Sequence, residues 1–364
     1  MSQDIHNETS VFITKGVTII TPGNITSLGF IQNNGNIHLS GNWLNTNIYQ
    51  GTGSISLEGV NQTFSNNNQS LSYLIAEGGG VKTIKGNLLI TQQVDFNNGL
   101  LLVRGNDALT MENNCEINNA SLLSYVDGPL ISKGTGYKFY PVGKNGAFHP
   151  VELTEVKGID PVVQVEVIED LPAVQTSAAA NLYKKFYWTR NTNAGSFESS
   201  PITLALEVSN FVDPLRLVIA ESNSINETFN LIDNVTYRPS ATLDIIGSRK
   251  AVTGNVFVLG EIPVDPPRQQ YLSTTLSPNA ENSVNRVIKI FGDNPNPSIF
   301  SFQVFNRWGS LIFESTSYSM MSTDGWDGRQ QGTLLQSGVY PYNLKMVDMH
   351  GNTISRTGFV TVIN

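Results

Sequence analysis

The chain contains the stretch Gly35-Asn36-Ile37-His38-Leu39-Ser40-Gly41-Asn42, in which apolar residues alternate with polar ones between two glycines. Related frames begin at Gly16, Gly35, Gly53, Gly80 and Gly99, evenly spaced except for one longer step. Short strands at near-constant spacing, separated by Gly/Asn turns, are typical of stacked β coils. We therefore predict a β-solenoid with one coil per about 18–20 residues, each coil burying its inward side chains on its neighbour.

The repeat leaves two points open. The longer step, from Gly53 to Gly80, predicts a coil that carries an extra loop, Asn66–Ser70. An ordinary antiparallel sandwich whose hairpins happen to be evenly spaced is the rival architecture for this region.

The composition of the 364-residue chain favours extended structure. Hydrophobic residues make up 40%, enough for real cores, and charged residues only 14%, against roughly 25% in an average soluble protein. Asn, Ser, Thr and Gly fill the polar positions, and these residues favour turns over helix interiors. Only one short stretch is helix-like, Ser177–Asn181, so we predict an all-β fold.

Charge and hydropathy exclude several classes of protein. The net charge is −8 and the 22 Lys and Arg are scattered, so we expect no nucleic-acid partner. No apolar run approaches the roughly 20 residues of a transmembrane segment. No secretory leader opens the chain, and we interpret Met1 as a start placed on a mature chain whose signal peptide has been removed. A single cysteine, Cys115, cannot form an internal disulfide, and we expect it to be a small buried side chain.

Proline and glycine punctuate the chain after the repeats, which occupy residues 1–127. Aromatic-rich strands between these residues, and the clean alternation of Val162–Ile168, predict a β-sandwich over 128–262 that caps the solenoid. Closely spaced prolines predict a stiff linker at 263–270. The last domain then spans 271–364.

Side chains that carry enzyme chemistry are sparse. The histidines are isolated in sequence, and none forms a pair with metal-site spacing: His6, His38, His149 and His350. His38 should point away from the core, and His350 lies in a loop at 348–352. We find no acid that recurs at a fixed position of the coil, as clustered carboxylates for proton transfer or calcium would require. We therefore predict that the chain is not an enzyme and has no catalytic residue, cofactor or metal.

Several aromatic residues of the first two domains permit two interpretations. They are core residues, as aromatics in β domains usually are, or they line one face and stack on sugar rings. These residues are Trp43, Tyr49, Tyr73, Tyr187 and Trp188.

The last hundred residues carry the most specific pattern. Alternating apolar residues in Ser301-Phe302-Gln303-Val304-Phe305-Asn306-Arg307-Trp308-Gly309 run into a turn, and a second strand, Leu311–Ser315, runs back. We expect Gly309 and Gly328 to supply turn positions, and Trp308 and Trp326 to anchor a small core. Pro341 falls inside a predicted strand, which favours an edge strand or a bulge.

This region resembles the gliding motility-associated C-terminal domain, the type B sorting domain of the bacterial type IX secretion system. The resemblance implies an Ig-like antiparallel β-sandwich. The chain departs from the family pattern after Ser-Pro-Asn, where Ala280–Asn285 replaces Gly-Asp-Gly and a later Asn-Asp, which argues against an ion-stabilised turn there. The matching residues are Pro278, Asn279, Phe305, Asn306, Arg307, Trp308, Gly309, Trp326, Asp327, Gly328, Gly338 and Tyr340.

The resemblance implies export to the cell surface or the medium, with the type IX translocon and its accessory proteins as partners. Our leading hypothesis is a non-enzymatic surface protein whose first two domains serve display, adhesion or partner binding, in association with gliding or a larger adhesin. The alternative is a carbohydrate-binding or polysaccharide-active solenoid, with glycans as ligands.

Overall fold

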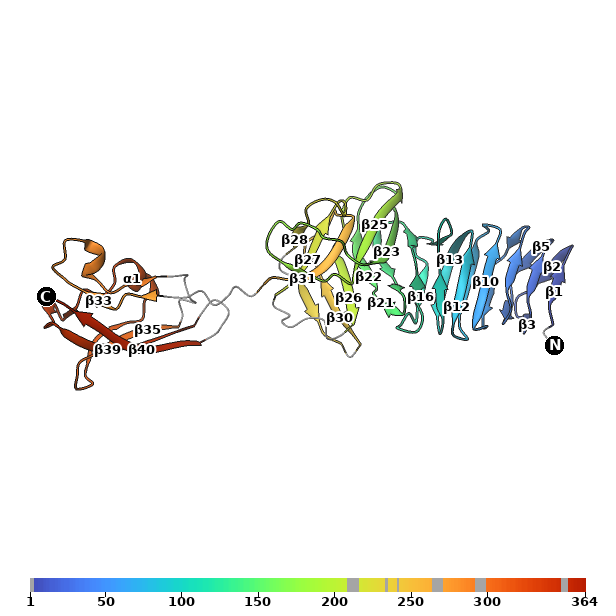
Figure 1. Ribbon diagram of the computed structural model, residues 1–364. Helices are drawn as coiled ribbons and strands as arrows, with labels where there is room; N and C mark the ends of the chain where they lie inside the picture. Colours follow the sequence, from blue (N-terminus) through green and yellow to red (C-terminus); the bar gives the residue numbers. More distant parts are fainter. Residues whose placement is uncertain are drawn as a thin grey trace. The chain divides into compact units, whose positions relative to one another are not determined.

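The computed structural model describes residues 3–207, 216–232, 235–240, 242–263, 271–291, 299–347 and 353–364. Strands account for 57% of the chain and helix for 3%, which confirms the all-β prediction. The chain divides into two compact units, Met1–Pro263 and Val264–Asn364 (Figure 1). Except for Pro263, the predicted linker at 263–270 lies outside the described residues, as does the predicted loop at 348–352.

The first part of unit 1 is a β-solenoid of about seven turns, as predicted. Its coils stack as parallel strands, which Figure 1 shows side by side. The rival antiparallel arrangement is therefore wrong for this region. The first sheet runs β1 (Ile5–Asn7), β4 (Ile25–Ser27), β7 (Trp43–Asn45), β10 (Asn61–Asn66), β12 (Val81–Lys85), β14 (Leu100–Leu102), β17 (Val126–Asp127), β20 (Val142–Lys144) and β21 (Ala147–Phe148).

A second sheet and a short third one complete the coils. In the solenoid, the second runs β3 (Thr18–Thr21), β6 (Asn36–Leu39), β9 (Ser54–Leu57), β11 (Leu71–Ala76), β13 (Asn87–Phe96), β15 (Ala108–Met111) and β18 (Leu130–Lys133), with β16 (Glu116–Asn118) also paired to β13. The third runs β2 (Ser10–Ile13), β5 (Phe30–Asn33) and β8 (Tyr49–Gln50).

The interpretation of the longer step between repeats is wrong. The frames at Gly16, Gly35 and Gly53 precede β3, β6 and β9 of the second sheet, whereas those at Gly80 and Gly99 precede β12 and β14 of the first. The step therefore passes from one face of the solenoid to another. Residues 67–70 form the corner between β10 and β11 rather than an inserted loop.

Registered stacking builds the solenoid core. Ile37 pairs with Ile55 of the next coil, and Trp43 pairs with Phe64 in the same way. The rings of Trp43 and Phe64 stack with centroids 5.8 Å apart. Because each coil places the same kind of side chain over its neighbour, apolar surface is buried continuously along the stack.

A β-sandwich closes the solenoid at its C-terminal end. β18 pairs in parallel with β15 on one side and antiparallel with β23 on the other, so one sheet and one core continue across residues 127 and 128. The continuation consists of β23 (Val162–Glu169), β25 (Phe186–Ala194), β31 (Val256–Glu261), β27 (Leu217–Ser222) and β28 (Asn230–Ile232), with β24 (Asn181–Leu182) on β31. The facing sheet consists of β19 (Gly136–Tyr140), β22 (Val151–Val156), β26 (Ile202–Glu207), β30 (Leu243–Gly247) and β29 (Thr236–Arg238).

The expected helical stretch at Ser177–Asn181 is wrong. Residues 177–180 are irregular and Asn181 begins β24. The described α-helix is instead α1 (Tyr318–Thr323), which is six residues long. It is capped by Ser317, whose side chain accepts a hydrogen bond from the Met320 N–H. A helix this short leaves too little apolar periodicity for sequence analysis to detect.

Unit 2 has a five-stranded sheet covered by a second layer. The sheet runs β33 (Thr275–Leu276), β40 (Thr353–Val362), β39 (Gly338–Val347), β35 (Phe300–Phe305) and β36 (Leu311–Ser315). The other elements are β32 (Tyr271–Leu272) paired with β34 (Ile290–Phe291), a 3₁₀ turn at Ser283–Arg286, α1, and β37 (Arg329–Gln330) paired with β38 (Thr333–Leu334). Buried residues from the sheet, from β34 and from α1 form one core.

The prediction that Pro341 marks an edge strand or a bulge is wrong, because β39 lies between β40 and β35 and its pairing with β40 runs through Pro341 without a register shift. The described pairing with β35 stops at Val304↔Tyr342, one residue short of Pro341. Proline is therefore tolerated here, because a residue beyond the end of the β35–β39 ladder donates no backbone hydrogen bond to β35.

Candidate functional site

The hairpin that joins β35 to β36 is organised by Asn306. Its side-chain Oδ1 accepts hydrogen bonds from the backbone N–H groups of Trp308 and Ser310, both at 2.9 Å. Gly309 has a φ of +80°, which confirms its predicted turn position and which a side chain would strain. These contacts fix the tip of the hairpin and, with it, the positions of Arg307 and Trp308.

The two tryptophans of unit 2 have opposite environments. Trp326 is 1% exposed, stacks on Phe313 with ring centroids 5.5 Å apart, and donates from Nε1 to the Arg329 carbonyl at 3.0 Å. Trp308 is 78% exposed, so the expectation that it anchors the core is wrong. The Arg307 guanidinium carbon lies 5.0 Å from the Trp308 ring centroid, a cation–π contact at the surface.

The remaining predicted residues of unit 2 hold turns and strand ends. Pro278 and Asn279 form a turn closed by the hydrogen bond from the Ala280 N–H to the Ser277 carbonyl at 3.0 Å. Asp327 Oδ1 accepts from the Arg329 N–H at 3.1 Å. Gly328 has a φ of +76°, Gly338 begins β39, and the Tyr340 hydroxyl donates to the Gln336 carbonyl at 2.7 Å.

The segment that departs from the family pattern is closed by a side-chain cation. The Nε of Arg286 donates to the Ala280 carbonyl at 2.6 Å, and one Nη donates to the Glu281 carbonyl at 3.3 Å. The Asn282 side chain accepts from the Val284 N–H at 3.0 Å. A guanidinium on backbone carbonyls therefore supplies the positive charge that closes this loop.

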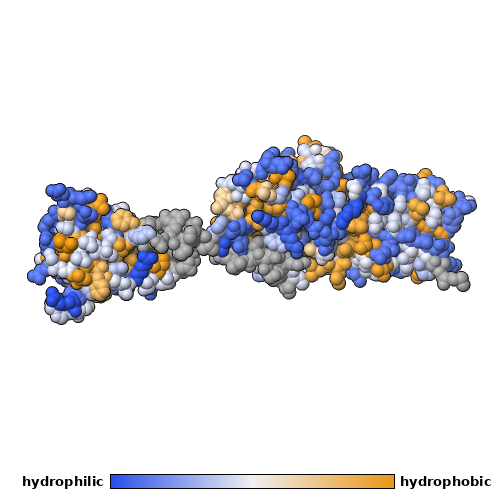
Figure 2. Space-filling model, in the orientation of Figure 1, coloured by the Kyte–Doolittle hydropathy of each residue, from blue (hydrophilic) through white to orange (hydrophobic). Residues whose placement is uncertain are grey.

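Apolar side chains form a row across the outward face of the unit 2 sheet. Phe305 pairs with Leu311, and Pro341 pairs with Phe359. Phe305 follows Val304, the registered partner of Tyr342, and therefore lies beside Pro341. Leu311 is 44% and Phe359 63% exposed. We call Leu311, Phe305, Pro341 and Phe359 the apolar row; Figure 2 shows apolar patches at the surface of this unit.

Unit 2 is similar to a known family of domains. Residues 271–362 match the family model of the CHU_C type IX secretion signal domain. The match covers 92 of the 364 residues and confirms the resemblance predicted from the sequence. No curated protein matches the chain.

A signal domain of this kind supports export by type IX secretion, as a secreted or cell-surface protein that interacts with the secretion machinery. Within the part of the chain that the structure describes, no helix is both long enough and apolar enough to cross a lipid bilayer.

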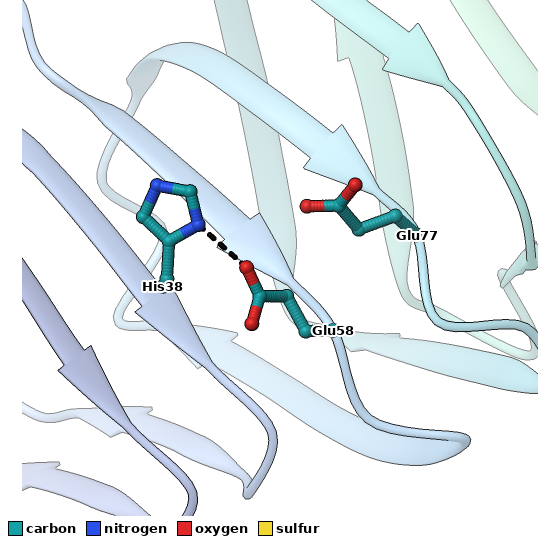
Figure 3. A group of neighbouring side chains, drawn as sticks. All are labelled: His38, Glu58 and Glu77. Atoms are coloured by element: carbon teal, nitrogen blue, oxygen red, sulfur yellow. Dashed lines mark hydrogen bonds and ion pairs between the residues drawn. The ribbon is translucent and has the colours of Figure 1, made fainter.

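Outside the signal domain, three polar side chains meet on the outward face of the solenoid. His38 Nδ1 lies 2.5 Å from Glu58 Oε1, and the Glu77 carboxylate points toward this pair (Figure 3). One ligand atom from each residue lies within 4.8 Å of those of the other two. The side chains of His38 and Glu58 are 31% and 32% exposed. We call these three residues the His–Glu cluster.

This cluster was not predicted from the sequence. His38 does point away from the core, as predicted, but the statement that no acid recurs at a fixed coil position is wrong. Glu58 and Glu77 directly follow Leu57 and Ala76, which are registered partners, so they occupy the same position of consecutive coils. The separation of the two glutamates equals one coil period and was the signal available in the sequence.

Most of the candidate sugar-stacking aromatics belong to the core. Trp43, Tyr49 and Trp188 are 1%, 3% and 1% exposed, so the sugar-binding interpretation is wrong for these three. Tyr187 is half-buried and packs against a small core cluster. Tyr73 is half-buried on β11 and lines a surface hollow together with Lys15, Asn34 and Thr52.

Two ionisable side chains of unit 1, Cys115 and His149, have pKa values shifted by burial. Burial, together with Glu116 and Glu112, raises the pKa of the half-buried Cys115 thiol to about 12, which keeps it protonated and unreactive. Burial lowers the pKa of His149 to about 4, with a smaller opposing effect from the Ala205 backbone. The His149 ring stacks on Phe186 with centroids 3.7 Å apart.

Proposed function

We propose that the chain is a non-enzymatic surface protein whose signal domain directs export and whose unit 1 is displayed for adhesion or partner binding. The match of residues 271–362 to a type IX secretion signal domain carries this proposal. In this organisation, unit 2 is the sorting signal and unit 1 is the part that is exported and displayed. Association with gliding or with a larger adhesin belongs to the same proposal.

The buried cations of unit 1 hold its own backbone, which supports a structural rather than a catalytic role for this unit. Arg190 is 4% exposed and donates to the Gly254 carbonyl at 2.9 Å and the Thr253 carbonyl at 3.0 Å. Lys82 is fully buried and donates to the Gly59 carbonyl at 2.7 Å. Catalytic acids and bases sit in clefts with their reactive atoms free to meet substrate, whereas these cations hold loops in place.

The outward face of the signal domain is the surface that we propose the secretion machinery contacts. Exposed aromatic residues and arginine are enriched at protein interfaces and dominate their binding energy. Trp308 with Arg307 at the hairpin tip, and the apolar row beside it, combine these properties. Leaving such side chains in water has no benefit for folding, which favours a role in recognition.

The export step is tested in cells that express the protein from its own gene, with and without a working type IX translocon. We expect surface signal by protease shaving and immunoblotting in the first strain, and periplasmic accumulation in the second. Deletion of residues 268–364 should abolish the surface signal. Equal surface signal in both strains, or export of the truncated chain, would show that the signal domain does not sort this protein.

The recognition surface is tested by paired substitutions on one sheet face. A double variant that combines Phe359→Ser with Trp308→Ala should lower the surface signal about tenfold, the effect expected when interface anchors are lost. Asn343→Ser lies outside the apolar row on the same strand as Pro341 and is the matched control. If the double variant remains folded and is exported as well as the Asn343→Ser control and the parent chain, the secretion machinery binds another surface.

Adhesion is tested by comparing attachment to abiotic and cellular surfaces of cells that display the full chain with that of cells that lack it. We expect attachment to fall when the gene is deleted and to return with the full-length gene. Unchanged attachment, together with purification of the displayed chain free of partners, would reject the passenger role.

The hollow around Tyr73 is the observation that favours glycan binding as a second function. A half-buried ring beside Lys15, Asn34 and Thr52 offers one stacking surface and several hydrogen-bonding groups. A glycan array and a reducing-sugar assay on the full chain, with Tyr73→Ala as the comparison, test it. Binding that disappears in the variant supports this function, and equal signals in both chains exclude the hollow.

A further inference from the structure

We propose that the His–Glu cluster binds a divalent transition-metal ion of the zinc class on the outward face of the solenoid. Among the described residues, this is the one group of three His, Cys, Asp or Glu side chains whose ligand atoms converge within 4.8 Å. Figure 3 shows the imidazole and the two carboxylates standing on the same side of the sheet, with their polar ends directed toward one another.

The coil register explains why these three residues meet. His38 on β6 is the registered partner of Ser56 on β9, two positions before Glu58. Glu58 and Glu77 follow registered partners on β9 and β11, so their backbones are one strand spacing apart, about 4.8 Å. Three successive coils therefore each contribute one ligand, and the stacked backbone fixes their separation before any ion arrives.

The charges of the cluster are unbalanced without a cation. Two carboxylates on neighbouring strands at the same position repel each other, an arrangement that destabilises a sheet. With a neutral imidazole, the three side chains carry two negative charges, which a divalent ion neutralises. The nearby Lys82 attracts Glu77, but its Nζ donates to the carbonyls of Gly59 and Gly79.

The donor atoms select the class of metal. Calcium and magnesium prefer sites built entirely from oxygen. An imidazole nitrogen with two carboxylates suits zinc and its neighbours in the first transition row. Three protein ligands leave one coordination position open to water or to a donor from outside the chain.

A buried hydroxyl beneath the cluster is an independent sign that the position of Glu77 matters. Ser56 projects from the outward side of β9, where Ser54 is half-buried, yet Ser56 is 0% exposed. Its Oγ donates to Glu77 Oε1 at 2.5 Å. Hydrogen bonds of this kind orient metal-binding carboxylates, and their loss typically weakens metal affinity 10–100-fold.

The solenoid also contains a matched comparison. His6 Nε2 lies 3.2 Å from Glu8 Oε1 in an exposed pair on and beside β1. It has the chemistry of the His38–Glu58 pair, but within the described part of the chain no third ligand converges on it. Zinc binding that came only from surface histidine–carboxylate pairs would involve both pairs equally.

The test is calorimetric titration of the tag-free full chain with zinc chloride. We expect one equivalent to bind, with affinity lowered roughly 100-fold by His38→Asn or Glu77→Gln and about tenfold by Ser56→Ala. His6→Asn should leave the affinity unchanged. Absence of saturable binding, or equal losses in His6→Asn and His38→Asn, would overturn the proposal.

A second measurement locates the ion and guards against variants that fail to fold. Circular dichroism without metal should be the same for every chain used. Cobalt(II) in place of zinc should give visible absorption bands of a nitrogen- and oxygen-ligated ion in the parent chain and in His6→Asn, and lose them in Glu77→Gln. Bands that persist in Glu77→Gln would place the ion elsewhere and refute the site.

Discussion

In the solenoid, Leu39, Leu57, Ala76 and Phe96 occupy registered positions of four successive coils, and each is 0% exposed. In the signal domain, Trp326 stacks on one ring, Phe313, within a small core, while Trp308 and Phe359 are 78% and 63% exposed. The solenoid spreads its burial over many equivalent positions. The signal domain gathers its buried residues, Phe302 and Trp326 among them, into one small core. Both units also leave some large apolar side chains in water, as Ile20 of the solenoid, 73% exposed, illustrates.

This difference follows from the two architectures. A stack of coils adds nearly equal increments of core, so that stability is shared between neighbouring repeats. A domain of about 90 residues buries a smaller fraction of its surface and depends on each large core residue. For this smaller unit, we propose that the apolar row serves recognition as well as folding.

The largest expected effect is the loss of the central aromatic of the signal domain. Trp326→Ala removes a fully buried ring and its hydrogen bond to the Arg329 carbonyl, at a cost of roughly 3–5 kcal/mol. Because a domain of this size has a total stability of about 5–15 kcal/mol, unit 2 should unfold at much lower urea concentration. Fluorescence and calorimetry should show the unit 1 transition unchanged; a joint shift of both transitions would contradict the comparison.

Next in size is the pH dependence that His149 gives to unit 1. Its pKa is lowered to about 4 in the folded chain, so the unfolded chain takes up the proton first as the pH falls from 6.5. This term stabilises the fold fully above pH 6.5 and is lost progressively down to pH 4, for a total of about 3 kcal/mol. Urea unfolding of His149→Phe against the parent chain between pH 4 and pH 7 measures it. Parallel pH profiles would show that the pKa of His149 is the same in the folded and the unfolded chain.

A smaller effect is expected from the asparagine at a solenoid corner. Asn66 Oδ1 accepts hydrogen bonds from Trp43 Nε1 at 3.1 Å and from Asn45 Nδ2 at 3.2 Å. Asn66→Ala leaves both buried donors without this acceptor and should cost about 1–3 kcal/mol. Hydrogen exchange should rise in the coils next to β10 and stay unchanged in the sandwich. Uniform loss of protection across unit 1 would indicate that the coils do not act as separable repeats.

The smallest effect on stability is expected from Trp308→Ala. The ring is largely in water, and surface substitutions usually change the free energy of unfolding by less than about 0.5 kcal/mol. Comparing the stability losses of Trp308→Ala and Trp326→Ala distinguishes the surface tryptophan from the core tryptophan of the same domain. A loss as large as that of Trp326→Ala, measured by urea unfolding of the full chain, would mean that Trp308 supports the fold after all.

The sequence predicted the solenoid because the alternation around Ile37 and Ile55 recurs at the coil period. It did not predict which sheet each repeat joins, because β9 and β12 have similar local patterns and differ only in the face on which they stack. The register of one coil on the next distinguishes them, and register is set by contacts between residues a full coil apart along the chain.

For the candidate sites, local motifs located the hairpin of Asn306 and Gly309 correctly. They could not distinguish Trp308 from Trp326, because each lies next to a glycine in a short turn motif. The direction of each side chain depends on the layer that covers it. The His–Glu cluster was missed for a related reason, since its members lie on three successive coils and join only when the coils are aligned.

The sequence by itself determined the class of the fold, the repeating coils, and the type IX secretion signal at the C-terminal end, because each is written in short-range alternation, turn residues and motif order. The tertiary structure decided which tryptophan is buried, where the apolar row lies, and that Glu58 and Glu77 stand side by side next to His38. Those outcomes depend on register and on layer packing, which bring together residues that the chain keeps apart.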